Sequence, residues 1–202
     1  MEPIDSYLTI KEEADFELKV KGSKFIGQAR ICPDKDTAET ILESIRKKYY
    51  DATHNCFAYR TGFGNDAVFR YSDDGEPSGT AGRPIYDTIE GSDLTNLLLV
   101  VTRYFGGTKL GTGGLTHAYS QTARETLAKA GTAEKLITGR LPMVVPFSDY
   151  NNVERTIYQM KASIISSDFA EVVRLTAEIR LTQMQSLREK LTDITSGRIR
   201  FE

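Results

Sequence analysis

A glycine-rich loop at residues 103–117 holds the residues whose types and spacing best suit the binding of an anion. Five glycines fall in nine consecutive positions, and Arg103 and Lys109 accompany them. Glycine lets the backbone approach a ligand closely, and the free N–H groups at the start of a following helix attract negative charge. The sequence therefore predicts a phosphate site, to which we assign Arg103, Tyr104, Gly106, Gly107, Lys109, Gly111, Gly113 and Gly114.

The charge around this loop favours the same interpretation, because no Asp or Glu occurs from Leu94 to Arg124. The loop nevertheless differs from the standard nucleotide signatures. The P-loop pattern ends in Gly-Lys-Ser/Thr, and the dinucleotide pattern requires a third glycine where this chain has Thr116. An alternative therefore stays open, in which the glycines only permit a tight turn between a strand and a closely packed helix.

A second stretch, residues 71–85, combines acids with small residues. Its carboxylates suit a divalent cation or general acid–base chemistry, or they order the neighbouring basic loop. A third interpretation is that they are solvated turn acids against an arginine. We favour the ordering role and expect the stretch to support the glycine-rich loop. The supporting residues are Asp73, Asp74, Gly75, Glu76, Ser78, Gly79, Thr80 and Arg83.

His54 and Cys56 lie close together in the chain and raise the question of a metal site. The chain has only two histidines and two cysteines, so a zinc site would need all of them or added carboxylates. A buried cysteine and a polar histidine at the end of a strand are the ordinary outcome. We therefore expect no metal and no cofactor.

The phosphate site requires a strand before the loop and a helix after it. The apolar run from Leu97 to Val101 predicts a strand buried on both faces, and a helix is expected from about Leu115 to Ala130, ended by Gly131. Further elements are expected upstream: two strands in residues 5–32, a helix capped by Asp36 or Thr37, a strand over 52–62 with Cys56 and Phe57 on opposite faces, a hairpin over 62–70, and a helix or turn over 87–96.

After Gly131 the glycine-rich stretches end and the pattern changes. Strands and helices alternate in the order βαββαβ, which is the split βαβ or ferredoxin-like arrangement. The helices, near residues 149–161 and 184–195, carry ordinary apolar stripes. The sequence thus predicts an α+β protein with two domains, residues 1–132 and 133–202.

Composition limits the classes of function. The chain has 202 residues, a net charge of −2 and a hydrophobic content of 40%. This charge argues against a wholly electrostatic nucleic-acid binder, so any basic surface is a local patch. Two cysteines and the absence of a secretory or membrane-spanning segment predict a reduced, cytoplasmic protein with no membrane partner.

Two strings, YSDDGEPSGTAGRPI and VVTRYFGGTKLGTGGLTHAYS, resemble the signature of the YigZ/IMPACT family, as do IDSYLTIKEE, KGSKFIG and THNCFAYR. For the N-terminal domain the resemblance implies a mixed sheet with helices, like the second domain of a small-subunit ribosomal protein. This fold also occurs in elongation factor G and in certain small-molecule kinases. For the C-terminal domain it implies a ferredoxin-like fold similar to the fifth domain of elongation factor G.

Eukaryotic members of the family act in translational control, but the module through which they bind their partner has no counterpart in this sequence. We expect a binding protein that contacts RNA, the ribosome or another phosphate-bearing ligand through the glycine-rich loop. Lys24 and Arg83 would be further phosphate contacts, and Tyr104 or Phe105 would stack on a base. One alternative is a Mg²⁺-dependent nucleotide-binding protein or enzyme that uses the acidic cluster 73–76. Another is a scaffold that binds proteins. No catalytic residue is assigned, His117 included, and the oligomeric state stays open.

Overall fold

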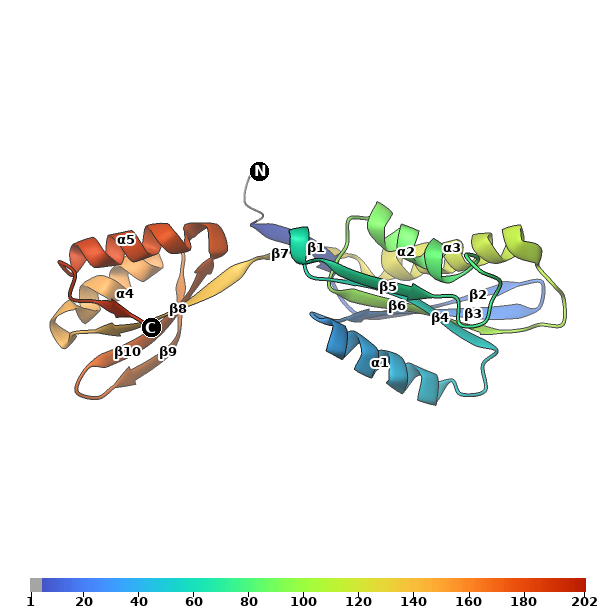
Figure 1. The fold of residues 1–202 in the computed structure, drawn as a ribbon, viewed down its shortest axis with the longest axis horizontal. Coiled ribbons are helices and arrows are strands. Elements are labelled where there is room, and N and C mark those ends of the chain that lie inside the picture. The colour runs from blue at the N-terminus through green and yellow to red at the C-terminus, as the bar shows by residue number, and fades with distance from the viewer. Residues whose placement is uncertain (1–4) are drawn as a thin grey trace. The chain divides into compact units, whose positions relative to one another are not determined.

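A computed structural model describes residues 5–202 of the chain (Figure 1). The chain forms two compact units, which we treat separately. Residues 7–135 make the N-terminal unit, and residues 136–202 together with Asp5 and Ser6 make the C-terminal unit. Within the described residues no helix is long and apolar enough to cross a membrane.

A five-stranded sheet forms the centre of the N-terminal unit. All of its neighbouring strands pair antiparallel. An isolated parallel bridge, Leu8 with Leu94, lies outside this sheet. In spatial order the strands are β2 (Ala14–Val20), β3 (Ser23–Ile31), β6 (Leu97–Tyr104), β4 (His54–Thr61) and β5 (Val68–Ser72).

Strand β6 is the middle strand and is buried on both faces, as the apolar run predicts. Leu97 and Leu99 pack with α2 (Gly82–Gly91) and α3 (Gly111–Ala130). Leu98 and Val100 pack on the opposite face with α1 (Lys35–Lys48). Figure 1 shows the same layering, with α1 on one side of the sheet and α2 and α3 on the other. The sheet thus brings the end of β6 beside the start of α3.

The expected faces of β4 are also confirmed. Cys56 and Ala58 belong to the core under α2 and α3, whereas Phe57 and Tyr59 belong to the core under α1. The hairpin after β4 is confirmed as well, because β4 pairs antiparallel with β5 around the short helical turn Gly64–Asp66.

Three helix starts differ from the sequence prediction. The cap of α1 is Asp34 and not Asp36 or Thr37, because the Asp34 carboxylate accepts a 2.7 Å hydrogen bond from the Thr37 N–H. Helix α2 begins at Gly82 instead of residue 87, and α3 begins at Gly111 instead of Leu115. Helix α3 extends into glycine-rich sequence and α2 extends back across Pro84 to Gly82, and propensity alone assigns both stretches to a loop.

The N-terminal stretch contains three strands where two were expected. Strand β1 (Ser6–Ile10) pairs with β7 (Thr132–Leu136) in a separate two-stranded sheet, while β2 and β3 form the predicted hairpin. The turn of that hairpin, Lys21-Gly22, has positive φ at both residues.

The C-terminal unit confirms the βαββαβ order. Its elements are β8 (Thr138–Val145), α4 (Tyr150–Gln159), β9 (Ser163–Phe169), β10 (Val173–Arg180), α5 (Met184–Ile194) and β11 (Arg200–Phe201). The strands lie in the order β11-β8-β10-β9 and pair antiparallel. Both helices cover one face of this sheet (Figure 1), where alternate residues of β8 and β10, such as Leu141, Val145 and Leu175, form the core.

Candidate phosphate-binding site

A cavity of about 430 Å³ lies in the N-terminal unit where the end of β6 meets the start of α3. Five residues named from the sequence line it: Glu76, Arg103, Phe105, Lys109 and Gly111. The other lining residues are His54, Thr53, Pro77, Leu110, Thr112 and Leu115. The structure therefore brings both unusual stretches, the acidic one and the glycine-rich one, to one hollow.

The start of α3 carries unsatisfied backbone donors. Its N-cap residue, Leu110, makes no side-chain cap bond, and the first turn holds no acid. The first N–H groups of a helix have no partner inside the helix, and aligned peptide dipoles add a partial positive charge there. The exposed Lys109 side chain adds a full charge beside them. This end of the cavity is therefore electropositive.

The glycines of the loop have different structural roles. Gly107 and Gly111 have φ angles of +84° and +74°, which residues with side chains rarely adopt. A Cβ on Gly106 would collide with the backbone of Gly22 in the β2–β3 turn, so this position needs a glycine for close packing. Gly113 lies in the first turn of α3 with open space around it. Gly106, Gly107, Gly113 and Gly114 shape the loop and helix start but do not line the cavity.

Tyr104, Lys24 and Arg83 do not line this cavity. The Tyr104 hydroxyl donates to Asp51 at 2.8 Å, and this hydrogen bond is the main reason why the pKa of Tyr104 rises to about 12. The Lys24 ammonium lies 4.8 Å from the centre of the Tyr104 ring, and Arg83 pairs with Asp87 at 2.6 Å.

Asp73 orders the acidic stretch itself. Its carboxylate accepts hydrogen bonds from three backbone N–H groups, those of Gly79, Ala81 and Gly82, at 2.8–3.0 Å. These bonds fold the small residues 78–82 against the end of β5 and satisfy donors at the start of α2. Gly82 has no room for a side chain, because a Cβ there would clash with the backbone of Ser72.

Asp74 fastens the same stretch to neighbouring elements. Its carboxylate accepts a 2.6 Å hydrogen bond from the Asn55 N–H and lies 3.2 Å from the Arg46 guanidinium. Its backbone carbonyl accepts a 2.8 Å hydrogen bond from Nδ1 of His54, since a carbonyl oxygen can only accept. A neutral His54 ring therefore carries its proton on Nδ1 and its lone pair on Nε2.

Glu76 is the acid that reaches the cavity. It is 8% exposed, and its Oε1 accepts from the Arg103 guanidinium at 2.6 Å and from the Tyr119 hydroxyl at 2.8 Å. Nε2 of His54 lies 3.8 Å from the same oxygen. The three acids thus have three different sets of partners, and residues 5–202 contain no group of three His, Cys, Asp or Glu side chains placed to hold a metal ion.

Arg103 connects the cavity to the core. Its guanidinium lies 5.4 Å from the centre of the Phe25 ring and 5.6 Å from that of Phe105, a geometry that favours cation–π attraction. Arg103 is 5% exposed, and its Nε–H has no acceptor among the described residues. A buried donor without a partner is uncommon in a folded protein and points to a place where a ligand completes the bonding.

Two residues behind the cavity are polar groups held in the apolar core. Burial is the largest cause that raises the pKa of Tyr119, with Cys56 and Glu76 as further causes. Burial likewise raises the pKa of the Cys56 thiol, which lies 3.3 Å from the Tyr119 hydroxyl. Neither group ionises near neutral pH, so the charge at this side of the cavity comes from the Glu76–Arg103 pair.

Sequence reasoning did not assign His54 and Tyr119 to the site. The sequence predicts that His54 is an ordinary polar residue at a strand end, yet the pairing of β4 with β6 places it directly opposite Arg103. Tyr119 lies two turns inside α3, and its only sequence signal is a large polar aromatic residue on the apolar face of that helix. Strand register would be needed to find His54, and the packing of α3 against the sheet would be needed to find Tyr119.

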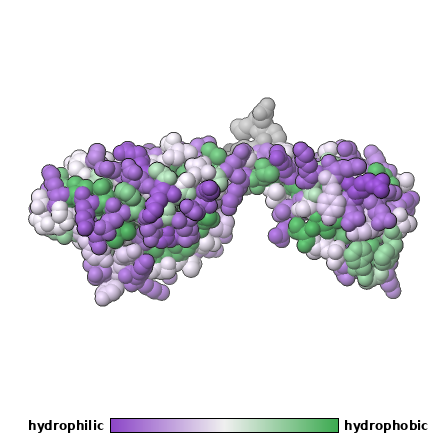
Figure 2. Space-filling view, turned by 180° about the vertical axis from the view of Figure 1, so that it is seen from behind, coloured by the Kyte–Doolittle hydropathy of each residue, from purple (hydrophilic) through white to green (hydrophobic). Residues whose placement is uncertain are grey.

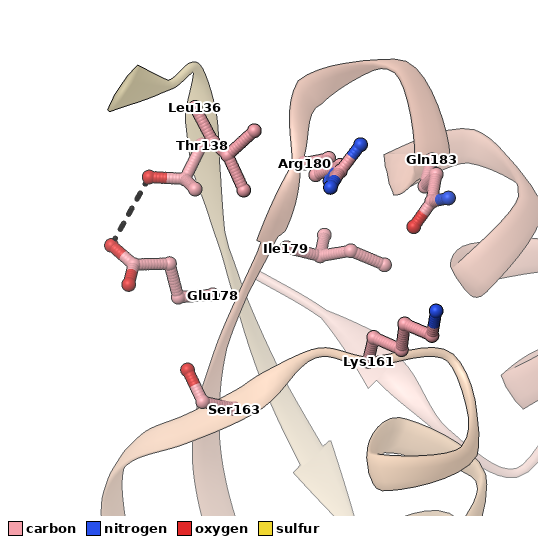
Figure 3. Close-up of a pocket in the computed structure, with 8 residues that line it drawn as sticks. All are labelled: Leu136, Thr138, Lys161, Ser163, Glu178, Ile179, Arg180 and Gln183. Atoms are coloured by element: carbon pink, nitrogen blue, oxygen red, sulfur yellow. Dashed lines mark hydrogen bonds between the residues drawn. The ribbon is translucent and has the colours of Figure 1, made fainter. Parts of the chain in front are cut away.

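A second hollow, of about 350 Å³, lies in the C-terminal unit (Figure 3). Lys161, Arg180 and Gln183 line it together with Glu178, which accepts a 3.3 Å hydrogen bond from Thr138. Its charged side chains are at the surface, and Arg180 pairs with Asp5 at 3.2 Å. This hollow is also next to a helix start, because Gln183, the N-cap residue of α5, lines it, but it lacks the buried ion pair of the first one.

The fold and the cavity define a two-unit α+β protein with a candidate anion site in its N-terminal unit. Residues 21–127 match the Impact N-terminal domain, and residues 143–198 match a domain of unknown function, DUF1949. The chain belongs to the IMPACT family.

Similar proteins cover nearly the whole chain. IMPACT family member YvyE of Bacillus subtilis is 31% identical over 96% of this chain and 89% of its own length. IMPACT family member YigZ of Escherichia coli is 31% identical over 91% of this chain and 90% of its own. A solved structure described as that of a hypothetical protein superposes with a TM-score of 0.74 at 30% identity, covering 98% of this chain and 97% of that one.

Proposed function

We propose that this protein binds RNA, free or within the ribosome, through phosphate groups held at the start of α3. The observation that carries the proposal is the uncapped, acid-free start of a 20-residue helix, flanked by Lys109 and open to a cavity. Backbone N–H groups at a helix start and a nearby lysine are common phosphate ligands in protein–nucleic acid contacts. Phe105, 48% exposed at the cavity wall, supplies an aromatic face for an unstacked base.

The choice of RNA among phosphate-bearing ligands rests on the family. The resemblance implies translational control for eukaryotic members, and likeness to a ribosomal-protein domain and to the fifth domain of elongation factor G. These likenesses are part of the proposal, as is a cytoplasmic location. The net charge of −2 fits binding through a few local contacts instead of a broad basic surface.

A Mg²⁺-dependent nucleotide enzyme that uses the acidic cluster 73–76 is the second candidate, and the contacts of this cluster favour it less. The Asp73 carboxylate is occupied by backbone N–H groups, Asp74 by Asn55 and Arg46, and Glu76 by Arg103. A cation would have to displace these partners. We therefore propose binding that does not depend on divalent ions.

A scaffold role would instead use exposed apolar surface. Hydrophilic residues cover much of the N-terminal unit in the view of Figure 2, and apolar residues gather along one edge of the C-terminal unit. Exposed large side chains of that unit include Phe147 and Phe169, whose ring centres lie 6.5 Å apart. These side chains belong to the C-terminal unit and do not line the cavity, so binding of a protein partner would be a second function of that unit.

A salt series tests the proposal. Binding of the purified protein to ribosomes and to bulk RNA should weaken as salt rises, and Lys109→Ala should lower the slope of log K against log salt by about one. Lys47→Ala, an exposed lysine on α1, is the matched control and should change the slope far less. Absence of binding at low salt would overturn the proposal, and an unchanged slope in Lys109→Ala would remove the start of α3 from it.

A further inference from the structure

We propose that the cavity receives one nucleotide unit with a terminal phosphate, its phosphate at the start of α3 and its base against Phe105. This inference rests on the proposed function and narrows it from RNA in general to a nucleoside 5′-monophosphate group. Such a group occurs at the 5′ end of an RNA strand and as a free nucleotide. The test below separates these two sources.

The volume of the cavity fits a ligand of this size. Small-molecule sites commonly enclose about 300–1,000 Å³ and combine apolar walls with a few converging polar groups. At about 430 Å³ this cavity is near the lower end of that range. Pro77, Leu110 and Leu115 form its apolar surface, so an extended phosphate chain alone would leave much of the wall without contact.

The distribution of charge sets the orientation of the ligand. Lys109 and the first N–H groups of α3 make one side electropositive, while the Glu76 carboxylate lies at another. The Glu76 carboxylate and the Arg103 guanidinium largely cancel each other's charge, so a phosphate gains little attraction there, whereas at the helix start it meets several donors and Lys109. A terminal phosphate carries more charge than an internal diester and has more free oxygens, so this side favours the end of a strand.

Phe105 supplies the surface for the base. Arg103 lies against the Phe105 ring, 5.6 Å from its centre, and holds it by cation–π attraction. The ring is still 48% exposed and lines the cavity, so part of it is available for stacking. Stacking of a base on an aromatic side chain is tolerant of base identity. The cavity should therefore bind different nucleotides with similar affinity.

Two polar groups of the cavity wall are incompletely bonded in a way that suits a sugar hydroxyl. The contacts of Glu76 with Arg103, Tyr119 and His54 all involve Oε1, and Oε2 takes part in none of them. The Arg103 Nε–H lacks an acceptor among residues 5–202. A hydroxyl both donates and accepts, so a ribose hydroxyl near Glu76 can donate to Oε2, which the contacts with Arg103, Tyr119 and His54 leave available.

The experiment compares two oligoribonucleotides of the same sequence, one with a 5′-phosphate and one with a 5′-hydroxyl, both labelled at the 3′ end and measured by fluorescence anisotropy. We expect the phosphorylated strand to bind about tenfold more tightly, as a few added charge-assisted bonds allow. AMP and CMP should compete better than inorganic phosphate. Competition by AMP as strong as that by the phosphorylated strand would identify free nucleotides as the ligand, and much weaker competition would identify strand ends.

One variant and a matched control assign the contact with the base to Phe105. Phe105→Leu keeps an apolar side chain but removes the ring, and should weaken AMP binding about tenfold without changing the binding of inorganic phosphate. Tyr50→Leu, an aromatic residue that is 85% exposed on the same unit, is the matched control and should leave both unchanged. Circular dichroism of each variant confirms that it is folded.

The outcomes separate this inference from the proposed function. One set of results would overturn the nucleotide pocket and keep RNA binding through internal phosphates. In it the two strands bind equally, Lys109→Ala loses binding, and Phe105→Leu binds as well as the unsubstituted protein. Absence of binding to every RNA would overturn the proposed function. AMP binding that depends on Phe105 would then still support the pocket, with a free nucleotide as its ligand.

Discussion

The hollow beside α3 and the hollow in the C-terminal unit are similar in volume, about 430 and 350 Å³, but they are built differently. The first contains a charged pair, Glu76 and Arg103, with side chains only 3% and 6% exposed. The second is lined by exposed charges such as Lys161 and Arg180. Volume alone therefore does not identify a site, whereas charges held in the core next to a cavity indicate one.

This difference has an energetic meaning. Removing two charges from water costs several kcal/mol per ion, and an ion pair recovers this cost only with good geometry and further hydrogen bonds. A surface pair such as Arg180–Asp5 avoids most of that cost and contributes little stability. The buried pair is an inefficient way to stabilise a fold, so its place beside the cavity favours a role in binding.

The largest expected effect comes from breaking the buried pair. Glu76→Gln leaves Arg103 in the core without its counter-ion and should lower the free energy of unfolding by about 3 kcal/mol. Glu178→Gln, in the wall of the other hollow, should change it by less than about 0.5 kcal/mol. Urea unfolding followed by far-UV circular dichroism measures both. Equal losses in the two variants would contradict the distinction between the hollows.

Glycine-to-alanine substitutions in the two units should show a smaller difference in the loss of stability. Gly106→Ala places a Cβ against the Gly22 backbone and should cost about 2 kcal/mol, as overpacking typically does. In Gly139→Ala the new Cβ meets the tip of the flexible Met184 side chain, which can move, so the loss should stay below about 1 kcal/mol. Thermal unfolding compares the two. RNA binding should fall only in Gly106→Ala, and equal binding by both variants would show that the loop shape is unimportant.

The smallest effect concerns pH and the C-terminal unit. Arg198 donates to both carboxylate oxygens of Asp149, at 2.8 and 2.9 Å, and these bonds lower the pKa of Asp149 below its ordinary value of 3.8. Because the folded-state pKa is the lower one, the pair stabilises the protein at neutral pH. This stabilisation is lost as the pH falls through the folded-state pKa.

Asp149→Asn should therefore lower the unfolding temperature at pH 7, and the difference from the unsubstituted protein should shrink on acidification below about pH 4. RNA binding should be unchanged at pH 7, because Asp149 belongs to the unit without the candidate site. A difference that is constant with pH would show that Asp149 acts through packing instead of charge.

Much of the fold follows from local sequence patterns. The apolar run of β6, the alternation in β4 and the βαββαβ order of the C-terminal unit are all periodic signals, and the structure has each of them. The predicted change of domain near residue 132 depended on the loss of glycine-rich sequence. The two compact units divide between Lys135 and Leu136, within β7 and just before its last residue.

The details that sequence reasoning missed depend on contacts between distant residues. The start of α2 is held by Asp73 through side-chain bonds that span up to nine positions, which helix propensity does not include. The Glu76–Tyr119 bond joins residues 43 positions apart and requires the sheet to be assembled. For the candidate site, composition predicted the loop and the acids, but only the tertiary structure shows that Glu76, and not Asp73 or Asp74, lines the cavity.

The contact between Gly22 and Gly106 has a consequence for the order of folding. The Gly106 N–H donates to the hydroxyl of Ser23, 83 positions away, which is the first residue of β3 and precedes the Lys24–Tyr104 pair of β3 and β6. Closing so long a loop costs entropy that only the completed β3–β6 pairing offsets. The glycine-rich loop should therefore reach its final shape late, after the transition state. In stopped-flow refolding, Gly106→Ala should accelerate unfolding and leave the folding rate almost unchanged.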